Sequence, residues 1–314
     1  MPINNVRLPG VIYYVILGVA VVNVSTASIL VRLAGGEGVH GFSVASWRLL
    51  ISSILTWVFL VILGGSSSVR LFFNPRDLGL MVLSGFALAL HFMLWMHSLA
   101  HINVAASVTI VDSYPALLAL IGRFILGESY SVAQYVGSLV AFLGILGISL
   151  ASYTGELAPP GGNPVLGAFL AFGGMVSVSA YFTIGRVMRA RYSTLEYTAV
   201  VYTAGALTAV PLTALADVNL VNLTPKAWIL IVLVALIPML GGHTLINYVI
   251  GRLSLLAATV PILGEPVGAT LLAFLILGEP IGQEVVAFMT LTLSGVAMVL
   301  IWEELKRTGS TLHR

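Results

Sequence analysis

Apolar runs follow one another along the 314-residue chain, each close to the length of about 20 residues that an α-helix needs to cross the hydrocarbon core of a bilayer. The runs show no strand-type alternation of apolar and polar residues, so helices rather than a β-barrel are expected to satisfy the backbone in lipid. We therefore predict an all-α multi-pass membrane protein with ten transmembrane helices. The expected spans are 11–32, 43–63, 79–99, 103–125, 133–152, 164–187, 196–215, 227–250, 254–277 and 284–302.

The composition excludes several classes of function. Charged residues make up 8% of the chain, against roughly 25% in soluble domains, so lipid must cover most of the surface. The absence of cysteine excludes disulfides and thiolate chemistry. Walker A, HExxH and hydrolase-elbow motifs are also absent. We expect no enzyme, cofactor, metal site or nucleic-acid binding, with an intramembrane enzyme that uses Asp112 and Glu265 as paired carboxylates as the alternative.

The basic residues are distributed unequally between the two sides of the predicted bundle. With ten spans, both termini lie on one side, and that side holds 11 of the 14 Lys and Arg residues. Cytoplasmic loops carry such an excess, so we predict a cell-membrane protein with both termini in the cytoplasm. The three basic residues on the other side are Arg32, Arg48 and Lys226.

Two stretches of the chain repeat the same landmarks. His91 matches His243, "VAASV" matches "LAATV", Pro115 matches Pro266 and "ILGES" matches "ILGEP", at an offset of 152 residues that becomes 151 at the prolines. Each half would then hold five spans, over residues 1–153 and 164–307. Because five is odd, the second half must enter the membrane from the opposite side. This is the inverted-topology repeat of secondary transporters, in which substrate binds near the midplane between the halves.

These residues carry a resemblance to a known family. With "SWRLLISS" in the second span and the paired endings "FILGES" and "FLILGEP" of the fourth and ninth spans, the chain resembles the EamA-type exporters of the drug/metabolite transporter superfamily. The resemblance covers nearly the full length. It implies ten helices built from a duplicated five-helix unit with cytoplasmic termini, and it says almost nothing about substrate.

Two acidic residues lie near the middle of predicted spans, Asp112 in the fourth and Glu265 in the ninth. A charged group at the bilayer centre costs about 2.5–3.5 kcal/mol on insertion scales, so such residues need a reason. One interpretation is a protonated carboxyl that packs against a neighbouring helix. The other is a proton carrier or a partner for a substrate amine in a cavity, and the equivalence of the two spans favours this second interpretation.

Three prolines stand within the same spans: Pro115, Pro261 and Pro266. Each removes a backbone donor and leaves a carbonyl without its helical partner, which must be satisfied by a neighbour, water or ligand. The proline beside Glu265 therefore indicates a kinked helix that lines a wet cavity, although a kink used only for packing stays open.

Two histidines, His91 and His243, lie in the inner parts of the third and eighth spans. Each has a partner four residues on, Trp95 and Asn247, and this spacing places each pair on one helical face. Histidine titrates near neutrality, so the pairs could shape a pocket or take part in proton transfer. A hydrogen-bonded packing role is the alternative. We regard Asn23 and Tyr181 as weaker cavity candidates.

Three further charged residues are predicted to act in structure or gating. Arg48 is counted about one turn inside its span, which is too shallow for a central site. Glu128 and Glu279 occupy equivalent "LGE" positions near the ends of the fourth and ninth spans, where an anchor, a gate element or a simple interfacial charge would each fit.

The sequence thus predicts a secondary transporter that exports small metabolites, such as amino acids, by alternating access. Its partners would be a small-molecule substrate and the lipid bilayer, with proton coupling and oligomeric state left open. Two alternatives remain. One is an antiporter or facilitator for sugar phosphates or nucleotide sugars, which is disfavoured because no cation is expected at the midplane. The other is a membrane scaffold without transport.

Overall fold

A computed structural model of the protein describes residues 10–64, 74–102, 104–151, 161–278 and 280–311. Within these ranges the regular structure is helical and contains no strand. Ten helical segments are long and apolar enough to cross a membrane. The all-α prediction and the span count are therefore confirmed. The segments are Gly10–Gly36, Gly41–Leu63, Pro75–Ser98, Ala106–Phe124, Val132–Ala151, Pro164–Met188, Thr194–Leu215, Pro225–Ile250, Leu255–Ile276 and Gln283–Thr308.

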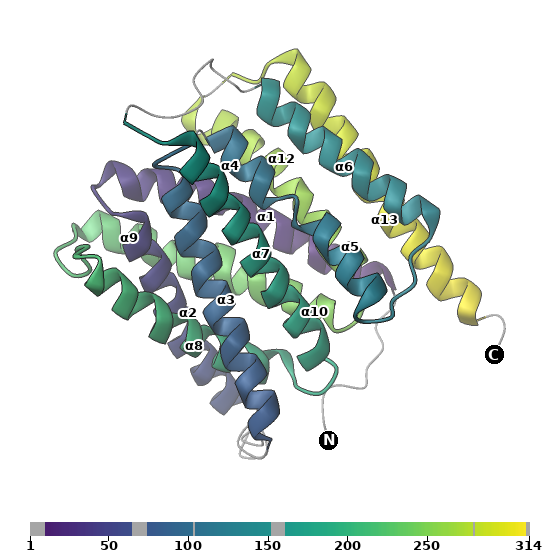
Figure 1. Cartoon of the computed structure of the whole chain (residues 1–314), viewed down its shortest axis with the longest axis horizontal. Coiled ribbons are helices and arrows are strands. Elements are labelled where there is room, and N and C mark those ends of the chain that lie inside the picture. Colours follow the sequence, from purple (N-terminus) through teal and green to yellow (C-terminus); the bar gives the residue numbers. More distant parts are fainter. Residues whose placement is uncertain (1–9, 65–73, 103, 152–160, 279, 312–314) are drawn as a thin grey trace.

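Seven of the ten spans are single α-helices, and the other three change helix type or break along their length (Figure 1). The uninterrupted helices are α1 (Gly10–Gly36), α2 (Gly41–Gly64), α3 (Pro75–Ser98), α6 (Val132–Ala151), α7 (Pro164–Met188), α8 (Thr194–Leu215) and α13 (Gln283–Thr311). The fourth span is α4 (Val104–Val111) and α5 (Tyr114–Phe124). The eighth is α9 (Pro225–Val234), the π-helix η3 (Ala235–Thr244) and α10 (Leu245–Ile250). The ninth is α11 (Leu255–Thr259), the 3-10 helix η4 (Val260–Gly264), α12 (Glu265–Leu272) and the π-helix η5 (Ala273–Leu277).

Equivalent spans of the two halves begin in the same way. Helices α3 and α9 each start with a proline in the first turn, where the missing N–H has no helical partner to lose. The preceding residue, Asn74 or Thr224, caps the helix by accepting a backbone N–H of that turn. The capped proline therefore fixes the register of both spans.

The two spans then diverge. His91 comes 16 residues after Pro75, whereas His243 comes 18 residues after Pro225. The π-helix η3 accounts for the two additional residues of the eighth span. A π-helical turn closes on i→i+5 rather than i→i+4 hydrogen bonds and so contains more residues. The eighth span is therefore a distorted copy of the third.

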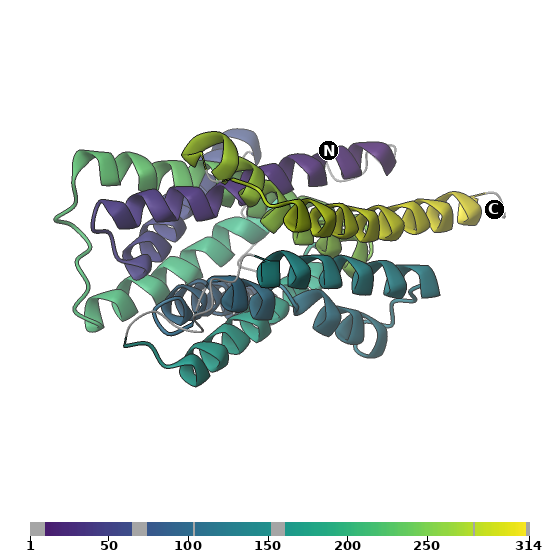
Figure 2. The same cartoon turned by 90° about the horizontal axis from the view of Figure 1, so that it is seen from above.

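Helices of the first half pack against helices of the second half. Helix α3 packs along α7 and α8, α2 packs along α8, and α1 packs against η3 and α12. At one edge of the molecule α6 and α13 lie side by side (Figures 1 and 2). Their axes approach closely because glycines face each other, and a Cβ built on Gly295 would lie 2.3 Å from the backbone nitrogen of Ala141.

Helix α1 begins and helix α13 ends at the same end of the bundle (Figure 2). We name this the termini end, and it also holds the turns between α5 and α6, α7 and α8, and α10 and α11. The opposite end, with the turns between α1 and α2 and between α8 and α9, is the far end.

Candidate functional site

The fourth and ninth spans both break at the position of their acidic residue. Helix α4 ends at Val111 and α5 begins at Tyr114, so Asp112 lies in the turn between two half-helices. In the ninth span the 3-10 helix η4 ends at Gly264, and Glu265 is the first residue of α12. The one-residue gap in the alignment of the two repeats therefore falls at these breaks.

Prolines explain where the spans break. Pro115 and Pro266 stand in the first turn of α5 and α12, where a residue without an N–H is tolerated. In the middle of a continuous helix each would remove a hydrogen bond and clash with the preceding turn. Pro261 occupies the same kind of position at the start of η4. Their local roles agree with the predicted kinks.

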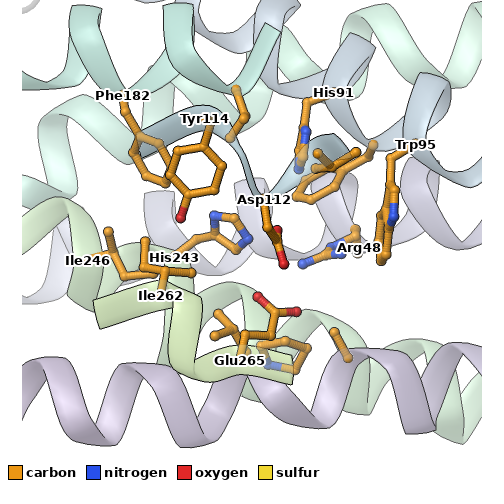
Figure 3. A pocket seen from close by; sticks show the side chains of 16 residues that line it. Arg48, His91, Trp95, Asp112, Tyr114, Phe182, His243, Ile246, Ile262 and Glu265 are labelled. Atoms are coloured by element: carbon orange, nitrogen blue, oxygen red, sulfur yellow. The ribbon is translucent and has the colours of Figure 1, made fainter. Parts of the chain in front are cut away.

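A cavity lies at the breaks, and it brings Asp112 and Glu265 together (Figure 3). Its volume is about 60 Å³, which is room for a few water molecules. The two carboxyl groups point toward each other across it, and the guanidinium of Arg48 lies beside them. The other lining residues are Val24, Ala27, His91, Phe92, Trp95, Val111, Tyr114, Val178, Phe182, Pro238, His243, Ile246 and Ile262.

Arg48 is the residue whose place the sequence predicted wrongly. We expected it to be too shallow for a central site, but α2 begins at Gly41 and carries Arg48 two turns into the bundle. The side chain is 1% exposed, and its guanidinium carbon lies 4.0 Å from the centre of the Phe92 ring.

The charge of Arg48 is incompletely satisfied. One terminal nitrogen contacts the Met239 sulfur at 3.6 Å, and Nε has no hydrogen-bond partner among the described residues. Glu265 is near enough to interact electrostatically, although no described carboxylate lies within ion-pair distance. A buried cation in this state has unused donors that face the cavity.

Three members of the predicted histidine pairs, His91, Trp95 and His243, meet in the cavity wall. The Nδ1 of His91 lies 3.1 Å from the Gly174 carbonyl oxygen, so this nitrogen carries the proton and Nε2 is left as an acceptor in the neutral ring. The ring stacks on Trp95 with a centroid separation of 6.4 Å. The Trp95 Nε1 and the His243 Nδ1 are buried without a partner in the described part of the chain.

Three other candidates lie outside the cavity lining. Asn247 and Tyr181, both 0% exposed, hydrogen-bond to each other on the termini side of the cavity. Asn23 donates to the Gly241 carbonyl at 2.9 Å and so joins α1 to η3. Sequence reasoning missed the aromatic lining residues Phe92 and Phe182, because they are indistinguishable from ordinary core residues in an apolar helix.

A polar network centred on Glu128 lies at the termini end. This carboxylate pairs with Arg186 at 2.6 Å, accepts the backbone N–H of Leu255 at 2.8 Å and accepts the Tyr130 hydroxyl at 2.9 Å. The donors come from both halves of the chain, so the network ties the halves together. Its repeat equivalent, Glu279, lies outside the described residues. No group of three or more potential metal ligands occurs among the described residues.

The profile of the EamA-like transporter family matches residues 10–150 and 165–301, which is one copy in each half. The chain belongs to the EamA-like transporter family. No curated protein matches the sequence closely enough to count as a relative. A solved structure described only as "Crystal structure of protein" is similar to the chain with a TM-score of 0.78 and 20% sequence identity, over 93% of this chain and 98% of the other. That similarity shows the fold alone.

Membership of the EamA-like family confirms the predicted superfamily and its two-repeat architecture. Family members are membrane transporters, and the ten apolar segments make this chain a multi-pass membrane protein. The two matched segments approximate the predicted halves 1–153 and 164–307, whose boundaries stay a prediction.

In this EamA-like protein the fourth and ninth spans pack against each other more closely at one end of the bundle than at the other. At the termini end α5 packs against α11. The equivalent pair at the far end, α4 and α12, makes at most marginal contact among the described residues. The fourth and ninth spans therefore converge from the cavity toward the termini end and diverge toward the far end.

Proposed function

We propose that the protein is a secondary transporter that exports small metabolites, such as amino acids, through the cavity at the broken spans. One observation carries this proposal. The two breaks bring Asp112 and Glu265, from different halves, into one cavity with the unsatisfied guanidinium of Arg48. Discontinuous spans that meet at the interface of inverted repeats are the usual setting for a transporter binding site.

The charges in the cavity favour a zwitterionic substrate. Arg48 offers unused donors to a carboxylate, and Trp95 and His243 add unpartnered nitrogens in the same wall. Asp112 and Glu265 offer acceptors to an ammonium group. An α-amino acid carries both groups a few ångströms apart. At about 60 Å³, the cavity is smaller than the 300–1,000 Å³ of typical ligand pockets, so it must widen to admit even a small solute.

The unequal packing of the broken spans supports alternating access. Contact between α5 and α11, with the Glu128 network, closes the path to the termini end. The symmetric alternative would bring α4 and α12 together and separate α5 from α11. The excess of Lys and Arg on the termini side supports a cytoplasmic position for that end. With that orientation, the described conformation would be closed to the cytoplasm.

The charge count of the cavity supports proton coupling. Two carboxyls and one guanidinium are neutral together when the carboxyls share one proton. A zwitterion adds no net charge to this set, but its ammonium, placed between the carboxyls, would compete with the shared proton for them. Release of the proton on one side and of substrate on the other would then be linked.

A phosphorylated sugar or nucleotide is the second candidate. The central position of Arg48 removes the reason for which the sequence disfavoured it. However, a phosphate would enter a cavity with two carboxyls and a single cation, and like charges at short range repel. The zwitterion is therefore the better match.

Counterflow in proteoliposomes tests the proposal. Vesicles loaded with unlabelled amino acids should accumulate external labelled amino acids, and Glu265→Gln or Asp112→Asn should lower the initial rate at least tenfold. Glu284→Gln is the matched control, because this carboxylate is exposed at the start of α13. Unchanged counterflow and unchanged response to a pH gradient in both cavity variants would refute the site. Exchange of sugar phosphates alone would favour the second candidate, and no exchange of any solute would favour a scaffold.

A further inference from the structure

A group of polar side chains lies between the cavity and the termini end, outside the cavity lining. We name it the hydroxyl column and define it as Ser84, Tyr181, Tyr197, Tyr202 and Asn247, all of which are 0% exposed. Phenylalanine would fill the space of the three rings without a buried hydroxyl, and buried hydroxyls are costly unless paired. The column therefore calls for an explanation beyond packing.

The upper end of the column begins at the cavity wall. The Asn247 amide donates to the His243 carbonyl at 2.7 Å and to the Tyr181 hydroxyl. The Tyr181 and His243 rings have centroids 6.3 Å apart. The Tyr202 hydroxyl lies 2.9 Å from that of Thr244, the residue after His243, and within interaction range of the Tyr181 hydroxyl.

The lower end reaches the turn between α7 and α8. The Tyr197 hydroxyl is 2.6 Å from that of Ser84, and Tyr197 interacts electrostatically with Arg189. The Arg189 guanidinium donates to the Asn247 carbonyl at 3.0 Å and to the carbonyl of Tyr192 in that turn. Arg189 is 7% exposed, so the column ends just beneath the surface at the termini end.

The upper and lower parts of the column meet beside Gly185. The Asn247 Oδ1 is buried without a donor among the described residues. A Cβ built on Gly185 would lie 3.1 Å from the Tyr197 hydroxyl and 3.4 Å from this Oδ1. Both atoms therefore lie close to Gly185, and a water that donates to the Asn247 Oδ1 and accepts from the Tyr197 hydroxyl would join the two parts of the column.

We propose that the hydroxyl column conducts protons between the cavity and the aqueous phase at the termini end while it excludes substrate. This proposal rests on the proposed function, since it supplies the proton exit that coupled transport needs. One proton leaves a cavity carboxyl, each hydroxyl or water accepts one proton on its oxygen and passes on another, and one proton reaches bulk water. The carboxylate is left behind and the column is restored unchanged.

The charges at the two ends of the column determine whether an added proton or a missing proton moves along it. Arg48 interacts with Tyr202 and Tyr181 at the upper end, and Arg189, itself near Arg252, interacts with Tyr197 at the lower end. Positive charge repels an added proton and stabilises a hydroxyl that has just given its proton away. Transfer would therefore start at the lower end and propagate toward the cavity.

Two variants interrupt the column without touching the cavity lining. Tyr197→Phe removes a hydroxyl, and Gly185→Ala places a methyl group 3.1 Å from the Tyr197 hydroxyl and 3.4 Å from the Asn247 Oδ1 while adding a good helix former. Gly173→Ala is the control, because it makes the same change in α7 where the only near atom is a side-chain carbon of Leu94, at 3.1 Å.

The experiment measures solute exchange and proton movement separately in proteoliposomes. A labelled mixture of the standard amino acids reports counterflow at equal pH, and internal pyranine reports pH after amino acids are added or after a potassium potential is imposed with valinomycin. Tyr197→Phe and Gly185→Ala should keep counterflow within twofold of wild type and lose proton movement at least tenfold, and the control should keep both.

Two outcomes would overturn the proposal: proton movement equal to wild type in both variants, or wild type that exchanges amino acids without moving protons. Absent counterflow in wild type would instead refute the proposed function, and the potential-driven proton movement would still decide on the column.

Discussion

Glu128 and Arg186 form a 2.6 Å ion pair that joins the first half of the chain to the second. The pair is partly buried, with 13% of the Glu128 side chain and 28% of the Arg186 side chain exposed. A lone pair of this kind would contribute little. Here the same carboxylate also holds the first N–H of α11 and the Tyr130 hydroxyl, so its loss leaves several donors unsatisfied.

We predict that Glu128→Gln lowers the unfolding free energy by about 1–2 kcal/mol, since a neutral amide accepts these bonds more weakly than a carboxylate. Thermal unfolding in detergent would measure the change. A double-mutant cycle with Arg186→Met isolates the pair, and additive effects of the two substitutions would show that the pair is not coupled.

The substrate interpretation of Arg48 can be tested with matched ligands. We predict that the wild type binds an α-amino acid at least tenfold more tightly than its amide, because only the carboxylate can pair with the guanidinium. Arg48→Met should remove this preference while filling the space beside Phe92 and Met239. Ligand-induced thermal stabilisation provides the measurement, and an unchanged preference in Arg48→Met would place the carboxylate elsewhere.

An ion pair at the far end predicts a pH dependence. Hydrogen bonds from Lys226 and then from Thr224 hold the pKa of Glu37 below its ordinary value of 4.5. A group with a lowered folded-state pKa adds stability above its unfolded pKa and loses it as pH falls through the folded value. The small difference in Tm between wild type and Glu37→Gln should therefore be constant from pH 7 to about 5 and shrink as the pH falls below 4.5 through the lowered folded-state pKa.

Salt provides the control for this prediction. The Lys226 side chain is 70% exposed and that of Glu37 is 22% exposed, so raising the ionic strength to about 1 M should shrink the same difference at pH 7. A difference that persists in acid or at high salt would mean that Glu37 acts by packing.

The seam between α6 and α13 predicts a large steric effect. A Cβ at Gly295 would lie 2.3 Å from the Ala141 nitrogen and 2.5 Å from the Gly137 carbonyl oxygen, and backbone atoms cannot turn aside. Gly295→Ala should destabilise the protein by about 1–3 kcal/mol. Gly18→Ala is the control, because nothing lies within 4 Å of its Cβ. Equal Tm values for the two variants would show that α6 and α13 can move apart without a loss of stability.

Hydropathy, repeat and proline position were sufficient to predict most of the architecture. Helix length follows from apolar runs, and the landmarks shared by the two halves predicted that Asp112 and Glu265 occupy equivalent places. The change of offset from 152 to 151 fell where the two breaks differ, between Asp112 and Pro115 in one span and before Pro266 in the other. These features are local or periodic, so they can be recognised in a single sequence.

The depth of Arg48 and the hydroxyl column could not be predicted in the same way. Depth was counted from the estimated start of the second span, and two residues of error moved Arg48 from the cavity to the interface. The column joins residues of four helices, and a tyrosine in an apolar run gives no sign of which neighbour its hydroxyl meets. Such contacts arise from packing between helices, which hydropathy does not encode.

The π-helix η3 gives the eighth span two residues that the third span lacks between its first proline and its histidine. The two halves therefore differ in the spans that carry His91 and His243. If the halves exchanged conformations, the resulting structure would not be equivalent to the original one. In the proposed alternating-access cycle, such halves would give two resting orientations of unequal free energy. Without a gradient the empty protein would mostly occupy one of them, and it would leave that orientation more slowly than it returns to it.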